Sequence, residues 1–221
     1  MKRLIAAIFV MAFTLPMFAQ YGHRYGGRPV TTTSSTYRSH RNASYYGLRL
    51  GAAFSTVNSD DPRLDGGKTQ TGLNLGLVAG FQLHNASPVY FETGLFYTEK
   101  GGKGNYDGKK FTYGLNYLEV PLTVKYVIEV DRPFSVQPFF GGYLACGISG
   151  KIKDFGDRKA YSSFDNDGFK RFDGGLRLGC GAQYDIIYAE LAYEFGLSNI
   201  CDDYFDTSHN RCLYLNCGVN F

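Results

Sequence analysis

Charged side chains recur at alternate positions of the sequence, in phase with glycine and other polar residues. The set comprises four glutamates and three bases, with an aspartate near one expected strand end: Glu92, Glu119, Glu190, Glu194, Arg49, Lys125, Arg177 and Asp173. Paired carboxylates can act as general acid and base. Ionised groups that are buried in a narrow interior must instead pair with one another. Because these carboxylates have neither a partner histidine nor a nucleophile, we expect a structural ion-pair network and no catalytic residue.

The segment around 198–211 holds the second group of reactive side chains. It contains metal-type ligands whose order and spacing match no zinc pattern: Cys201, Asp202, Asp203, Asp206, His209 and Cys212. A disulfide between Cys201 and Cys212 would suit an oxidising envelope and would restrain the loop. We therefore predict that disulfide and expect no metal site.

Two further motifs carry no chemistry. Asp165-Asn166-Asp167-Gly168 has part of a calcium-loop pattern but lacks its closing glutamate, so it reads as a turn. Gly179-Cys180-Gly181 lies within an expected strand and not between a strand and a helix. We expect no cofactor and no nucleic-acid partner.

The chain begins with features of export. Lys2 and Arg3 precede an apolar run over 4–18, which predicts a signal peptide over 1–20 that is cleaved after Ala19 or Gln20. Residues 21–45 hold four arginines, no acid and no apolar periodicity. We expect a flexible basic periplasmic tail there. Contact of this tail with anionic lipid or with another envelope component is the alternative.

From residue 46 onward apolar and polar residues alternate with a period of two. Leu48 and Leu50 share one face of the first such segment, while Arg49 and Gly51 share the other. Seven further segments repeat this pattern, over about 72–83, 89–98, 117–126, 134–146, 175–184, 189–197 and 213–221. Strands of about ten residues with an uncharged outer face cross a bilayer when tilted.

The connections alternate in length. They are long at about 58–70, 99–112, 149–172 and 198–211, and short at 84–87, 129–132 and around Asp185. Outer-membrane barrels have long extracellular loops and short periplasmic turns. We therefore predict an all-β fold, an eight-stranded antiparallel up-and-down transmembrane β-barrel over 46–221. A soluble periplasmic lipocalin-like ligand-binding barrel is the alternative fold.

Several segments resemble the PorT-like family of outer-membrane β-barrel proteins. The most specific is YLEVPLTVKY at Tyr117–Tyr126, and the others are QPFFGGYLACGIS, FDGGLRLGCGAQYD and YAELAYEFGLSNI. The resemblance covers residues 46–221. It implies an eight-stranded barrel that the outer-membrane insertion machinery assembles, with Phe221 as the terminal aromatic of the assembly signal. PorT itself is associated with protein secretion, whereas most relatives have no assigned activity.

We therefore expect a non-enzymatic, integral protein of the Gram-negative outer membrane with a side-chain-filled lumen. Its role would be structural, loop-mediated binding, or service to a secretion or envelope complex. An enzyme that uses the lumenal carboxylates is the alternative. Basic and aromatic residues of the longest loop are candidate contacts for lipopolysaccharide phosphates or a partner protein: Lys151, Lys153, Arg158, Lys159, Tyr161 and Phe164. Expected partners are outer-membrane lipid, the insertion machinery and secretion or envelope proteins.

Overall fold

The computed structural model describes residues 44–59, 69–84, 87–106, 109–154, 161–164, 169–201 and 208–221. Residues 41–221 form one compact unit. The expected signal peptide and nearly all of the expected basic tail lie outside the described residues. Within the described ranges, no helix has the length and apolar character needed to cross a membrane.

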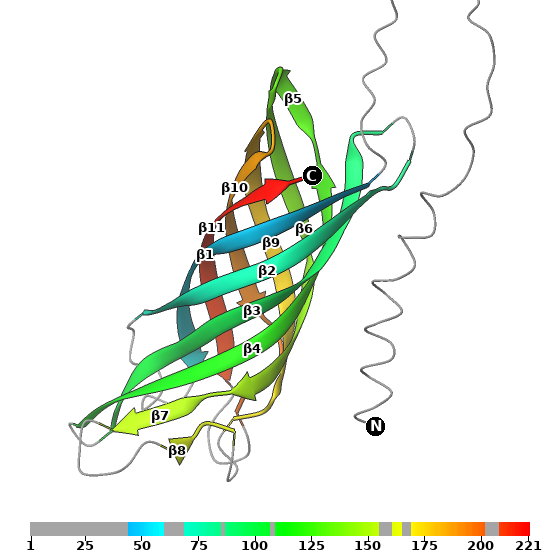
Figure 1. Cartoon of the computed structure of the whole chain (residues 1–221). Helices are drawn as coiled ribbons and strands as arrows, with labels where there is room; N and C mark the ends of the chain where they lie inside the picture. The colour runs from blue at the N-terminus through cyan, green and yellow to red at the C-terminus, as the bar shows by residue number, and fades with distance from the viewer. Residues whose placement is uncertain are drawn as a thin grey trace, which may run out of the picture. The chain divides into compact units, whose positions relative to one another are not determined.

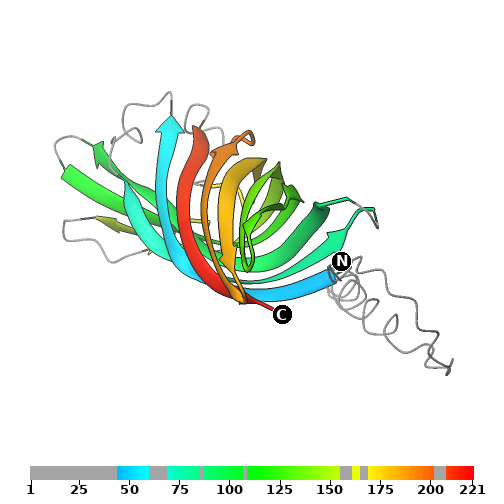
Figure 2. The same ribbon diagram turned by 90° about the horizontal axis from the view of Figure 1, so that it is seen from above.

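The described strands close into a barrel. Eight are long: β1 (Ser44–Ser59), β2 (Gln70–Gln82), β3 (Val89–Tyr106), β4 (Lys109–Tyr126), β6 (Phe134–Ser149), β9 (Phe172–Tyr184), β10 (Ile187–Gly196) and β11 (Ser208–Asn220). Each pairs antiparallel with its neighbour in the chain order, and β1 pairs with β11, which closes the ring (Figures 1 and 2). The predicted eight-stranded antiparallel up-and-down barrel is confirmed.

Three short strands decorate this barrel. β5 (Ile128–Asp131) pairs with the start of β6 at a turn. β7 (Lys151–Asp154) pairs with the beginning of β4, and β8 (Tyr161–Ser162) pairs with β7. The expected long loop over 149–172 thus contains a small antiparallel extension of the sheet, which lies beside the far end of the β3–β4 hairpin (Figure 1).

The expected loop over 99–112 was wrong in its bounds. β3 continues to Tyr106 and β4 already begins at Lys109. Paired residues run without a break from Glu99–Asn116 to Tyr106–Lys109. The prediction ended the strand too early because Gly101, Gly102 and Gly104 dilute the alternating pattern, although this hairpin still forms a regular ladder.

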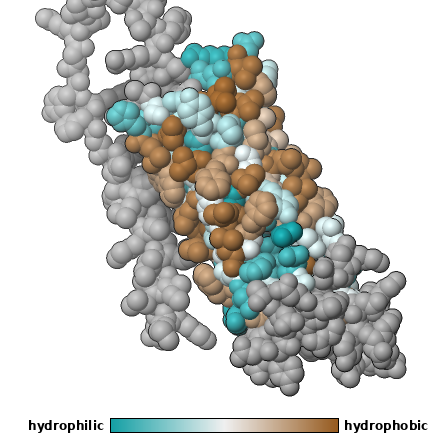
Figure 3. Space-filling model, turned by 180° about the vertical axis from the view of Figure 1, so that it is seen from behind, coloured by the Kyte–Doolittle hydropathy of each residue, from teal (hydrophilic) through white to brown (hydrophobic). Residues whose placement is uncertain are grey.

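The outer surface of the barrel is apolar. Leu50, Phe140, Leu191 and Leu215 each expose more than half of their surface. Apolar residues predominate over the middle of the face in Figure 3, and hydrophilic residues gather toward its ends. A soluble lipocalin-like barrel would need a polar outer face, so this surface is the one a lipid-embedded barrel requires.

Inward glycines make room for large side chains in the narrow lumen. A Cβ atom at Gly76 would collide with the ring of Phe96, and one at Gly181 would collide with the ring of Tyr188. Both aromatic side chains are buried. Glycine is therefore required at these two positions by close approach, because an interior of eight strands is only wide enough for side chains to fill it.

Candidate functional site

The lumen holds a buried ionic network. All seven residues that the sequence assigned to the inner face are at most 6% exposed: Arg49, Glu92, Glu119, Lys125, Arg177, Glu190 and Glu194. Lys100 and Asp173 are buried with them. The described lumen thus contains five carboxyl groups and four basic groups, and such groups are stable away from water only when they pair.

Arg177 on β9 joins three glutamates. Its Nη1 lies 2.8 Å from Glu194 Oε1 and 3.1 Å from Glu119 Oε1. Its Nη2 lies 3.2 Å from Glu190 Oε1. The planar guanidinium with its fixed fork of donors suits this arrangement, because one side chain can satisfy carboxylates on β4 and β10 together.

Lys100 on β3 completes this network on the side of the long connections. Its Nζ lies 2.8 Å from Glu194 Oε2 and 2.9 Å from Glu119 Oε2. Asp173 Oδ2 lies 3.7 Å away and accepts a hydrogen bond of 2.8 Å from Asn210 Nδ2. The ammonium also lies 4.4 Å from the centre of the Tyr143 ring.

A second ionic group lies nearer the short turns. Lys125 Nζ donates to Glu92 Oε2 at 2.7 Å and to Tyr188 Oη at 2.9 Å. Tyr45 donates a very short hydrogen bond to the same Glu92 carboxylate. Arg49 Nη2 lies 3.6 Å from Glu92 Oε2, and its guanidinium lies 4.0 Å from the centre of the Tyr188 ring.

Neutral hydrogen bonds join the ionic groups to the rest of the wall. Asn216 Nδ2 donates to Glu190 Oε1 and Tyr214 Oη donates to Glu194 Oε2, each at 2.8 Å. Asn74 Nδ2 donates to Asn216 Oδ1 at 2.9 Å. These contacts fix the carboxylates in place, since a carboxylate that accepts several hydrogen bonds has little freedom to reorient.

An apolar cluster covers the ionic network on the side of the long connections. It is formed by nine buried residues: Val57, Tyr113, Leu115, Tyr117, Tyr143, Ala145, Phe169, Ile200 and Cys201. Phe169 and Cys201 come from connections between strands and form an antiparallel bridge with each other. The ring of Phe169 stacks on Tyr113, with 5.3 Å between the ring centres. The connections therefore fold back over this end of the lumen.

The sequence did not identify Lys100 as part of the network and placed Asp173 only near a strand end. Lys100 fell inside the expected loop over 99–112 and not in a strand. The available signal was the spacing Glu92, Phe96, Thr98, Lys100, which keeps the inward phase of β3 beyond the point where the strand was expected to end. Extending the period by one more step would have placed Lys100 in the lumen.

The predicted disulfide between Cys201 and Cys212 is not formed in the structure. Cys212 belongs to β11, whose start is earlier than predicted, and its side chain lies in the lumen with Ala53, Phe139, Ala192 and Tyr214. Cys201 packs in the separate apolar cluster that covers the lumen. The bond was predicted for two cysteines at the ends of a loop, whereas one of them is an inward-facing strand residue.

No group of three or more metal-type ligands occurs among the described residues. Asp202, Asp203 and Asp206 lie outside them. Cys146, Cys180 and Cys217 are exposed on the outer face, in the phase the sequence predicted.

The expected loop contacts have different surroundings. Lys151 and Lys153 are exposed on β7. Phe164 is not an exposed contact, because it packs against the apolar cluster with its ring nearly perpendicular to that of Tyr117. Arg158, Lys159 and the side chain of Tyr161 lie outside the described residues. Phe221 is 66% exposed, and its backbone exchanges hydrogen bonds with Tyr46.

A closed ring of eight strands with an apolar outside and a paired ionic inside defines the class of transmembrane β-barrels. Residues 18–202 match the family model described as outer membrane protein beta-barrel domain. The chain belongs to this family and is an integral protein of the outer membrane. It matches none of the curated proteins with which it was compared.

Solved structures of similar fold are also outer-membrane barrels. A major outer membrane protein from Thermus thermophilus is 17% identical, with 81% of this chain and 100% of that chain covered and a TM-score of 0.50. The attachment invasion locus protein Ail of Yersinia pestis is 18% identical, with 80% and 99% covered and a TM-score of 0.43. OprG from Pseudomonas aeruginosa is 14% identical, with 81% and 96% covered and a TM-score of 0.44. At these identities the likeness concerns the fold alone.

Proposed function

We propose that this protein is a non-conducting, non-enzymatic barrel that presents a binding or structural surface on the outside of the outer membrane. The observation that carries the proposal is the double filling of the lumen. The ionic network spans its middle, and the apolar cluster with Phe169, Ile200 and Cys201 covers its outer end. A lumen that is filled in this way leaves no continuous path for a solute.

The binding surface lies at the end with the long connections. There the β3–β4 hairpin and β7 form a regular sheet beyond the shorter strands (Figure 1). Lys103, Lys151 and Lys153 are exposed on this extension. A rigid sheet that carries exposed cations suits an anionic surface of a partner protein or of lipopolysaccharide.

Conductance in a planar bilayer tests the proposal. The full chain should insert without producing current steps at moderate voltage, while a known porin in the same membrane produces them. Heat-modifiable migration on a gel verifies that the inserted sample is folded. Reproducible steps from the folded protein would overturn the non-conducting assignment.

The lumenal carboxylates serve the structure in this proposal. Glu190 and Glu194 both contact the Arg177 guanidinium and are at most 5% exposed, so they do not face a substrate cleft. Changing Glu190 or Glu194 to Gln should lower stability and change no turnover of phospholipid or peptide substrates. A measurable wild-type turnover that either variant abolishes, with the barrel still folded, would favour the enzyme instead.

We further propose that the chain is a PorT-like barrel in service to a secretion or envelope complex. The segment that carries the resemblance is the second half of β4, which supplies Tyr117, Glu119 and Lys125 to the lumen. Assembly by the insertion machinery through Phe221, and export by a cleaved signal peptide, belong to the same proposal. N-terminal sequencing of the mature protein tests cleavage after Ala19 or Gln20.

Cross-linking and affinity purification from the outer-membrane fraction test the association. Recovery of secretion or envelope components is expected. Isolation of the barrel with no partner would leave the loop-mediated binding role and remove the complex-subunit role.

A further inference from the structure

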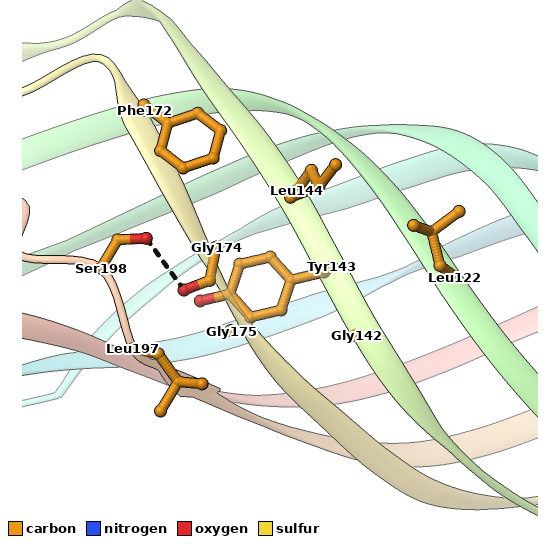
Figure 4. Close-up of a pocket in the computed structure, with 9 residues that line it drawn as sticks. All are labelled: Leu122, Gly142, Tyr143, Leu144, Phe172, Gly174, Gly175, Leu197 and Ser198. Atoms are coloured by element: carbon orange, nitrogen blue, oxygen red, sulfur yellow. Dashed lines mark hydrogen bonds between the residues drawn. The ribbon is translucent and has the colours of Figure 1, made fainter.

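The outer wall of the barrel carries a shallow groove that is separate from the lumen. It is a groove of about 380 Å³ between β4, β6, β9 and the start of the connection after β10, lined by Leu122, Gly142, Tyr143, Leu144, Phe172, Gly174, Gly175, Leu197 and Ser198 (Figure 4). Its volume falls in the range of small-molecule sites, about 300–1,000 Å³. Because it opens on the apolar outer face, its occupant in the membrane is a lipid or another membrane-embedded chain.

Glycines form the floor of this groove. Gly142 pairs with Leu122 across one strand boundary, and Gly174 pairs with Leu144 across the next. Both glycines occupy outward positions, where most neighbours carry large apolar side chains. The missing side chains leave a depression whose walls are Leu122, Leu144, Phe172 and Leu197, each between 39% and 63% exposed.

The groove lies in the outer half of the membrane. β9 runs for 13 residues from Phe172 to Tyr184, and the short turn follows Tyr184. Thirteen residues at about 3.3 Å each, tilted by about 40°, rise by about 30 Å, which equals the thickness of the hydrocarbon core. Phe172 is therefore at the outer boundary, and the groove descends from there.

Polar and cationic groups lie at the outer end of the groove. Ser198 Oγ donates to Gly174 O at 3.2 Å, as the dashed line in Figure 4 marks. Lys170 and Arg171 directly precede Phe172 and are exposed. The backbone N–H of Lys170 donates to Ile200 O at 2.7 Å, which fixes this residue at the start of β9. The Arg171 side chain is engaged elsewhere, because Nη1 donates to Gly147 O at 3.2 Å and the guanidinium lies 5.3 Å from the centre of the Phe164 ring.

The apolar groove and its polar outer end together determine the chemistry of the occupant. A bulk lipid tail is as apolar as the groove, so apolar contact alone gives no preference for one lipid over another. The exposed Lys170 ammonium at the membrane boundary does give a preference, because it attracts phosphate. We propose that the groove holds one acyl chain of a phosphorylated outer-leaflet glycolipid, with its phosphate beside Lys170. This inference rests on the outer-membrane location and not on the proposed loop or complex role.

Native mass spectrometry of the full chain in non-ionic detergent tests this site. The probe is lipid A with two phosphates, titrated against its dephosphorylated form and against phosphatidylglycerol. One saturable bound lipid A per barrel is expected, with the dephosphorylated form at least tenfold weaker. Lys170→Gln should weaken binding about fivefold, which corresponds to about 1 kcal/mol per cation. The control is Arg132→Gln, an exposed residue at the opposite end of the barrel.

The groove itself is tested by filling it. Gly174→Leu places a side chain over the floor, where a Cβ would lie 3.3 Å from Tyr143 O and 3.5 Å from Leu144 Cδ2, so the neighbouring strand must shift by a few tenths of an ångström. Binding of lipid A should fall severalfold. Ala79→Leu adds the same side chain to the outward face of β2, on the other side of the barrel, and should leave binding unchanged.

Three results would overturn the proposal: equal binding of lipid A by the Gly174→Leu and Ala79→Leu variants, equal binding of the dephosphorylated form, or equal binding of phosphatidylglycerol. The last result would assign the groove to a phospholipid. Heat-modifiable migration establishes that each variant is folded, and Gly142→Leu replaces Gly174→Leu if the latter does not fold.

Discussion

Lys100 Nζ on β3 and Glu194 Oε2 on β10 lie 2.8 Å apart, although four strand boundaries separate their strands in the eight-stranded ring. The pair therefore joins opposite walls of the barrel directly through its centre. Hydrogen bonds between neighbouring strands fix the wall, but they do not by themselves fix the cross-section. A contact across the diameter does.

Replacing Lys100 by Met should destabilise the barrel strongly. The change removes an ammonium that lies 2.9 Å from Glu119 Oε2 and 2.8 Å from Glu194 Oε2. Removal of one partner from a buried ion pair costs about 3–5 kcal/mol. Urea unfolding, followed by heat-modifiable migration, measures the loss. Lys103→Met, at an exposed position of the same strand, should change the free energy of unfolding by less than about 0.5 kcal/mol. Equal effects of the two variants would contradict a structural role for the central pair.

Replacing Tyr188 by Phe should cost about 1–3 kcal/mol of stability. The hydroxyl accepts a hydrogen bond from Lys125 Nζ at 2.9 Å, and its loss leaves a proton of a buried ammonium without that acceptor. The ring contact with Arg49 remains, so the variant isolates the hydroxyl. Tyr184→Phe is the matched control, because Tyr184 is 58% exposed near the short turn. The same unfolding assay compares both variants, and a neutral Tyr188→Phe change would show that the ionic group of Lys125 and Glu92 does not need this hydrogen bond.

Replacing Gly76 by Ala should destabilise the barrel by about 1–3 kcal/mol, because the added methyl group overlaps the buried Phe96 ring. A second change, Phe96→Leu, should recover part of the loss. Gly114→Ala should be tolerated, since a Cβ there meets no atom closer than 3.8 Å. Folded yield and urea midpoint are the measurements. A stable Gly76→Ala variant without the second change would mean that the lumen is more loosely packed than described.

Arginine substitutions on the outer face should report depth in the membrane. Leu191→Arg lies near the middle of β10 and should cost about 2–4 kcal/mol, whereas Leu83→Arg lies at a short turn and should cost about 0–1 kcal/mol. Unfolding from phospholipid vesicles measures both. A similar cost at the two positions would contradict the assignment of the apolar belt to the hydrocarbon core.

The barrel could be predicted from the sequence because a membrane enforces the alternation of its strands. Residues such as Leu48 and Arg49 must face lipid and lumen in turn, so the pattern can be recognised without knowing which strands pair. The ionic residues of the lumen follow from the same phase. Their partners do not, because the contact between Lys100 and Glu194 depends on which strands lie opposite each other, which a single strand pattern does not contain.

Features at the strand ends could not be predicted from the sequence for a related reason. Cys212 looked like a loop residue because the alternation weakens before Leu213, yet β11 begins at Ser208. Phe164 was predicted as an exposed loop contact, but it packs against the apolar cluster that covers the lumen, in which Phe169 is buried. Tertiary contacts determine where these residues lie, and the alternation of residues within one strand does not indicate those contacts. The groove could not be predicted from the sequence either, since Gly142 and Gly174 become neighbours only through the pairing of β6 with β9.

The seam between β1 and β11 joins the first and last of the described strands over the whole length of β11, from Gly47–Asn220 to Ser59–Ser208. Until β11 is in place, one edge of β1 has no hydrogen-bond partners, and lipid offers none. An open ring would therefore leave unpaired backbone groups in the hydrocarbon core, at a cost on the order of several kcal/mol for each group. Closure of the ring therefore depends on contacts between the most distant parts of the described chain.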